Sequence, residues 1–116
     1  EMNNSIELKL KDKVLRCSFG LGFLGECLEN LDLSVFEIGE KLDKNPFKWI
    51  PILMFESIKY ADENVELTKN ELVDLLDNAE GQKVMSEFLN AFVKSLNKDV
   101  PIQEGTTQKK GTPKKK

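Results

Sequence analysis

The sequence predicts an α+β fold, mostly helical, in which an N-terminal β-hairpin packs on about five helices. Within the first twenty residues, apolar residues recur at every second position in two runs, at residues 6–10 and 15–19, which is typical of strands. Beyond residue 23 they recur at three- and four-residue intervals, as on one face of a helix. Capping sequences at two further positions indicate where helices begin.

Ile6, Leu8 and Leu10 alternate with charged residues and predict the first strand. Asp12-Lys13 is expected to form the turn, and residues 14–19 the second strand. Alternation does not determine the register between the strands. The inward face of the second strand should carry Leu15, Cys17 and Phe19.

Gly20-Leu21-Gly22 is expected to end the strand in a tight turn and to begin an amphipathic helix over residues 23–31. Ser34 and Glu37 form a capping box, in which each side chain accepts a hydrogen bond from the other residue's backbone N–H, so a second short helix should begin there. Gly39 should weaken this helix.

Asn45-Pro46 is a helix start signal, with Asn as the cap and Pro at the first helical position. Pro51 leaves two alternatives, because the helix either kinks there or begins there. Residues 50–61 are apolar on most sides, which predicts the central, buried helix. Since a small core cannot easily bury that much apolar surface, we expect an apolar groove between this helix and its neighbours. Aromatic residues around Pro51 should pack in the core, namely Phe47, Trp49 and Phe55.

Thr68 and Glu71 form a second capping box. The helix that follows should direct Leu72, Val73, Leu75 and Leu76 inward. Residues 78–81 predict a break before the last helix. That helix carries the clearest periodicity in the chain, with apolar residues repeating every four positions at Val84/Met85, Phe88/Leu89, Phe92/Val93 and Leu96.

Length and composition predict one globular domain over residues 6–100. The chain has 116 residues, of which 40% are hydrophobic and 32% charged. Glu1 before Met2 is typical of recombinant expression, so residues 1–5 should be a flexible remnant. Residues 101–116 should be a disordered Lys-rich tail. No stretch has the length and apolar character of a transmembrane segment or a secretory signal.

The charge is unevenly distributed. The chain carries −3 in total and residues 101–116 carry +4, so residues 1–100 carry −7. An acidic body does not favour a dedicated nucleic-acid binder, whose electrostatic footprint is normally basic. The sequence therefore predicts no specific nucleic-acid partner and no membrane partner.

The sequence offers no catalytic, cofactor-binding or metal-binding residues, and we predict that the protein is not an enzyme. It contains no histidine, which excludes histidine-based triads and proton shuttles. Cys17 and Cys27 are expected to be buried thiols, with a disulfide between them as the minor alternative. The Gly20-Leu21-Gly22 turn lacks the residues that complete a phosphate-binding loop. Carboxylate pairs at helical spacing should lie on solvated faces, namely Glu26/Glu29 and Asp74/Asp77.

The order of these features resembles the tail assembly chaperones of long-tailed bacteriophages. The resemblance covers residues 6–97, and its most specific part is the Ser18-to-Leu24 stretch, Ser-Phe-Gly-Leu-Gly-Phe-Leu. It continues with Asn45-Pro46-Phe47 before a helix rich in Leu, Ile and Tyr, then Leu67-Thr68, then a Lys-rich end.

This resemblance implies a protein that binds the phage tape-measure protein, keeps it soluble and helps to recruit tail-tube subunits. It also implies a place in the host cytoplasm and not in the mature virion. We expect self-association, because a chaperone that coats a long client binds it repeatedly, and the edge of the hairpin is the expected contact. Two alternatives remain: a structural head–tail adaptor of the virion, and a small DNA-binding regulator with a helix-turn-helix in residues 34–46.

Overall fold

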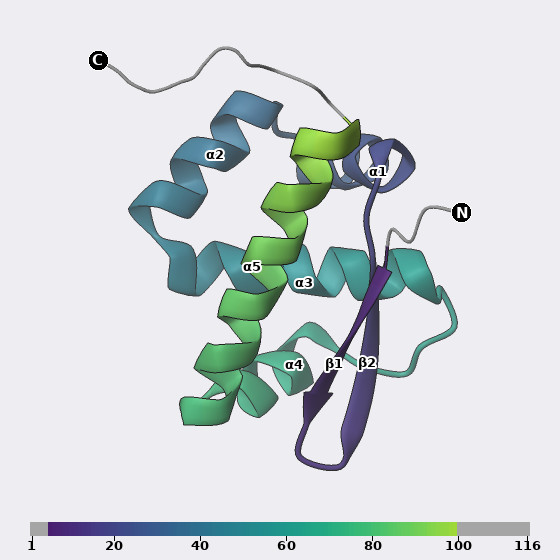
Figure 1. Ribbon diagram of the computed structural model, residues 1–116, viewed down its shortest axis with the longest axis vertical. Helices are drawn as coiled ribbons and strands as arrows, with labels where there is room; N and C mark the ends of the chain where they lie inside the picture. The colour runs from purple at the N-terminus through teal and green to yellow at the C-terminus, as the bar shows by residue number, and fades with distance from the viewer. Residues whose placement is uncertain (1–4, 100–116) are drawn as a thin grey trace.

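The computed structural model describes residues 5–99, and side chains as far as residue 96. An N-terminal hairpin packs on five helices, which confirms the predicted fold class (Figure 1). Ser5 belongs to the first strand and not to a flexible N-terminus. The predictions for residues 1–4 and 101–116 lie outside the described residues. In chain order the elements are β1 (Ser5–Leu10), β2 (Lys13–Ser18), α1 (Leu21–Leu31), α2 (Val35–Lys44), α3 (Pro46–Ala61), α4 (Lys69–Leu76) and α5 (Ala79–Asp99).

The hairpin turn lies one residue earlier than predicted, at Lys11-Asp12, and Leu10 pairs with Lys13. A turn at Asp12-Lys13 would place the same side chains on the core face as the observed turn does, so alternation could not distinguish the two. Lys11 has a φ of 56°, and its backbone N–H donates to a carboxylate oxygen of Glu80 in α5, 3.4 Å away. This contact joins the turn to the start of the last helix.

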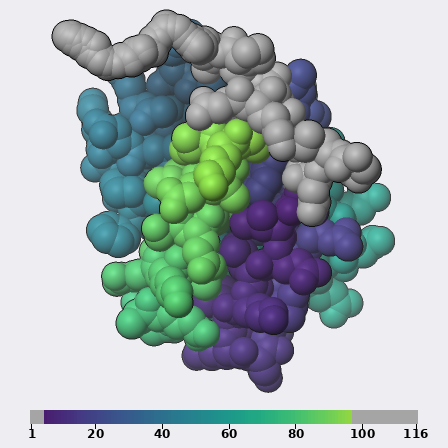
Figure 2. Space-filling view, in the orientation of Figure 1, coloured from purple at the N-terminus to yellow at the C-terminus, as the bar shows by residue number. Residues whose placement is uncertain are grey.

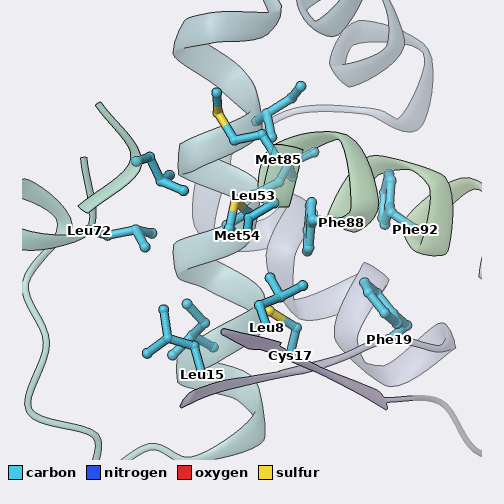
Figure 3. Close-up of a cluster of buried hydrophobic side chains, with 14 of the residues drawn as sticks. Leu8, Leu15, Cys17, Phe19, Leu53, Met54, Leu72, Met85, Phe88 and Phe92 are labelled. Carbon is cyan, nitrogen blue, oxygen red and sulfur yellow. The ribbon is translucent and has the colours of Figure 1, made fainter. Parts of the chain in front are cut away.

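The hairpin covers α3 and α5 with one face. β2 packs chiefly on α3, and β1 packs on α5. In Figure 3 the strand side chains Leu8, Leu15 and Cys17 point toward these two helices. The opposite face carries exposed side chains, including Glu7, Lys9, Val14 and Arg16. The predicted inward face is therefore correct.

The central helix is α3, as predicted, and its buried residues include Ile50, Leu53, Met54 and Ile58. It begins at Pro46 and continues through Pro51, so the alternative start at Pro51 is wrong. Asn45 precedes the helix as its cap position, but its side chain makes no capping hydrogen bond. Its backbone carbonyl instead accepts from the N–H groups of residues 48 and 49, at 3.2 Å each.

Both predicted capping boxes are present. The Ser34 hydroxyl accepts from the Glu37 N–H at 3.1 Å while the Glu37 carboxylate accepts from the Ser34 N–H at 2.7 Å. Thr68 and Glu71 repeat the arrangement at the start of α4. α1 ends in a Schellman motif, with Asp32 in the left-handed conformation at φ 58° and ψ 48°.

The break predicted for residues 78–81 is shorter in the structure. Only Asp77 and Asn78 separate α4 from α5, and Gly81 lies inside α5. The Asn78 side chain accepts from the Gly81 N–H at 2.7 Å and donates to the Leu75 carbonyl at 3.0 Å. The Asn78 side chain therefore satisfies a backbone group at the end of α4 and another at the start of α5, which allows a connection of only two residues.

Every helix and strand contributes buried side chains to one hydrophobic core. Val84, Met85, Phe88 and Phe92 are buried, as predicted for the last helix. Three residues that were expected to lie inside are exposed instead: Phe47 (69% exposed), Val73 (43%) and Val93 (46%).

Candidate protein-binding surface

An apolar groove lies between the first turns of α3, the outer face of α4 and the start of α5. It is an open hollow of about 150 Å³, enough for an apolar side chain from a partner. We name it the Phe47 groove. Its lining residues are Phe47, Pro51, Val73, Leu76, Asp77, Gln82 and Met85.

Three local features of the chain form this groove. α2 and α3 are separated by Asn45 alone, so Phe47 stands in the first turn of α3, before the core begins. The Thr68–Glu71 capping box fixes the start of α4, on which Val73 lies one helical turn from Asp77. Close packing of Gly81 against Leu76 brings the first turns of α5 beside the end of α4.

The groove presents apolar surface that the monomer does not use. Phe47 and Val73 are 69% and 43% exposed, whereas Pro51, Leu76 and Met85 form a buried floor. Asp77 and Gln82 are exposed at the rim. An apolar floor with a polar rim is the arrangement that accepts one face of an amphipathic helix.

A larger hollow of about 570 Å³ borders the other half of α3, between that helix and α1. It is not the apolar groove expected beside residues 50–61, because carboxylates and amides dominate its wall. Asn30 Nδ2 donates to Glu56 Oε1 at 3.1 Å across it. Its acidic lining residues are Glu26, Glu56, Asp62 and Glu63.

The two cysteines are free and buried, which agrees with the expected buried thiols. Burial raises the pKa of the Cys17 thiol to about 12, although a hydrogen bond with Ser57 acts in the opposite direction. Burial also raises the pKa of Cys27 to about 12, and the nearby Glu56 carboxylate adds to the effect. Both thiols therefore remain protonated near neutral pH, and neither has the character of a nucleophile.

Three further aromatic residues, on α2 and α3, differ in their exposure. Trp49 is half-buried, and the Lys41 and Lys48 ammonium groups lie 5.2 and 5.4 Å from its ring centroid. Phe55 also packs partly against the core, as expected for both residues. Phe36 on α2 is 83% exposed and borders none of the hollows described above.

The carboxylate pairs at helical spacing are exposed, as predicted. Gly20 makes the strand-to-helix turn with a φ of 110°, a value that favours glycine. Among residues 5–99, no group of three or more His, Cys, Asp or Glu side chains is placed to hold a metal ion. The helices of this same region do not combine the length and apolar character that a bilayer span requires.

The sequence predicted an apolar groove beside residues 50–61, but it did not identify the residues that line the Phe47 groove. Phe47 and Val73 were both expected in the core, and only their helices' relative placement leaves them exposed around a shared hollow. A comparison of the chain with protein-family models, curated proteins and solved structures finds no match.

Proposed function

We propose that this protein is a tail assembly chaperone of a long-tailed bacteriophage. In this function it binds the tape-measure protein, keeps it soluble and helps to recruit tail-tube subunits, in the host cytoplasm and outside the mature virion. The observation that carries the proposal is the Phe47 groove. The sequence resemblance over residues 6–97 also supports the proposal.

The Phe47 groove suits the task of covering apolar stripes on a helical client. A long helical client exposes apolar stripes until the tail tube surrounds it, and exposed stripes of that kind aggregate. A small groove binds one turn of such a stripe weakly. Many copies would cover the whole stripe, and each copy could leave when a tube subunit arrives.

Co-expression tests the proposal. The wild-type chain should keep the cognate tape-measure protein in the soluble fraction and co-purify with it. Phe47→Ser should reduce both, because it removes the largest exposed apolar side chain of the groove. Phe36→Ser is the matched control: it removes an equally apolar and even more exposed ring on α2, and it should leave the client soluble.

Equal loss for both variants would place binding outside the Phe47 groove. No solubilisation by the wild-type chain would remove the proposal itself. Thermal unfolding of both variants should match the wild type, since neither ring is buried.

Two alternatives make different predictions. A structural head–tail adaptor would be present in stoichiometric amounts in purified virions, where the proposed chaperone would be almost absent. A DNA-binding regulator was expected to use residues 34–46 as a helix-turn-helix. In the structure that segment contains one whole helix, α2 (Val35–Lys44), and Asn45 alone separates it from α3.

A further inference from the structure

We propose that the outer edge of β1 pairs with β1 of a second copy of this chain, in one register that Glu7 and Lys9 select. The pairing would join two hairpins into a continuous antiparallel sheet. The proposal depends on the fold and not on the proposed client, so either can fail without the other.

The hairpin register determines which backbone groups face outward. Leu10 and Lys13 flank the two-residue turn and exchange the ladder hydrogen bonds, and the bonded pairs then alternate along the strands. Lys9↔Val14 and Glu7↔Arg16 are the pairs between them. The N–H and C=O groups of these residues therefore point away from the hairpin, on its two outer edges.

The two outer edges differ in what covers them. On β2, the Ser18 carbonyl belongs to the outward series, and it accepts a hydrogen bond of 2.8 Å from Ser57 of α3. The sheet contains only β1 and β2 within residues 5–99. The Glu7 and Lys9 side chains are exposed, and Figure 2 shows β1 at the surface beside α5. An edge of this kind invites pairing with another strand.

The charges of Glu7 and Lys9 favour a second copy of this chain as the strand that pairs with β1, and they determine the register of the pairing. Opposite residues in an antiparallel pair must point to the same face of the sheet. If Leu8 lies opposite Leu8 of the other copy, Glu7 lies opposite Lys9 at both symmetric positions. The neighbouring register places Glu7 opposite Glu7, where like charges repel. The self-complementary order Glu-Leu-Lys therefore favours the first register.

Charge reversal gives a sharp test by sedimentation over a wide concentration range. Glu7→Lys places lysine opposite lysine, and Lys9→Glu places glutamate opposite glutamate. Each variant alone should raise the dissociation constant by about tenfold or more, because both symmetric pairs become repulsive. An equal mixture of the two variants should associate again, since every pair is then of opposite charge.

Glu40→Lys and Lys44→Glu are the matched controls, because both side chains are exposed on α2. These controls should associate like the wild type. Monomeric wild-type protein at millimolar concentration would overturn the proposal. So would single variants that associate normally, or a mixture that stays monomeric.

Amide hydrogen exchange of the wild-type chain provides a second measurement that needs no variant. The Glu7 and Lys9 amides should become protected as concentration rises, while those of Val14 and Arg16 should not change. Protection of Val14 and Arg16 instead would assign the contact to β2 and contradict the proposal.

Discussion

The hydroxyl of Ser57 donates a hydrogen bond of 2.8 Å to the carbonyl oxygen of Ser18, and so joins α3 to the end of β2. Ser57 has no exposed surface, although it lies in the central helix among buried apolar residues. Its small side chain lets α3 approach the strand closely, and its hydroxyl satisfies a carbonyl group on the strand's outer edge. Burial of this polar residue is therefore compensated by its hydrogen bond.

Ser57→Ala should lower the free energy of unfolding by about 1–2 kcal/mol, because the partly buried Ser18 carbonyl loses its donor. Denaturant unfolding measures the loss. Ser95→Ala is the matched control: the Ser95 hydroxyl donates at 2.8 Å to the Phe92 carbonyl within α5. That local bond should contribute within about 0.5 kcal/mol, as for most substitutions away from the core. Equal losses for the two variants would contradict a special role for Ser57.

The sequence predicted the parts of the fold that depend on local chemistry. Alternation identified the inward face of the hairpin, and the capping boxes at Ser34 and Thr68 marked helix starts that the structure confirms. The four-residue repeat identified Val84, Phe88 and Phe92 as core residues. Each of these signals involves residues that are close in sequence, so no knowledge of the tertiary arrangement was needed.

The features that the sequence did not predict depend on how elements meet. Phe47 and Val73 have the apolar character of core residues, and only the placement of α3 against α4 leaves them exposed. The single-residue role of Asn78 was hidden because an Asn near a Gly is also typical of a loop. The sequence therefore predicted an apolar groove beside the central helix, but not the residues that line it.

Gly81 and Gly39 should respond in opposite directions to the same substitution. A Cβ on Gly81 would collide with the backbone of Leu76, so Gly81→Ala should lower stability by about 2 kcal/mol or more. A Cβ on Gly39 meets nothing within 4 Å in α2, so Gly39→Ala should raise stability by about 0.5–1 kcal/mol. Thermal or denaturant unfolding measures both. A neutral Gly81→Ala would show that α4 and α5 do not need this close approach.

The cysteines should make stability depend on alkaline pH. Both thiols have a pKa of about 12 in the folded chain, against 9.0 as the ordinary value. Between these values the unfolded chain releases protons that the folded chain retains, so the thiol contribution is present below pH 9 and decreases as pH rises toward 12. Denaturation midpoints should therefore fall more steeply above pH 9 in the wild type than in the Cys17→Ala/Cys27→Ala variant. Parallel curves would show that the thiols ionise normally in the folded protein.

Phe88 should be the most sensitive position of the last helix. Its side chain has no exposed surface, and its ring lies 5.6 Å from Phe19 and 6.1 Å from Phe92 between centroids, stacked on the latter. Truncation to alanine removes contacts with both rings and leaves a cavity between the hairpin and α5. Phe88→Ala should therefore cost about 3–5 kcal/mol in denaturant unfolding.

A loss of that size approaches the whole stability of many small domains, which is about 5–15 kcal/mol. Phe88→Leu gives a measurable companion, because leucine keeps most of the apolar volume and should cost only about 1 kcal/mol. Phe47→Ala is the exposed control and should change stability by less than about 0.5 kcal/mol. If Phe88→Ala cost no more than Phe47→Ala, then α5 would not be anchored through this ring. The stripe of Val84, Phe88 and Phe92 would then have to be reassigned from the core to a surface that binds a partner.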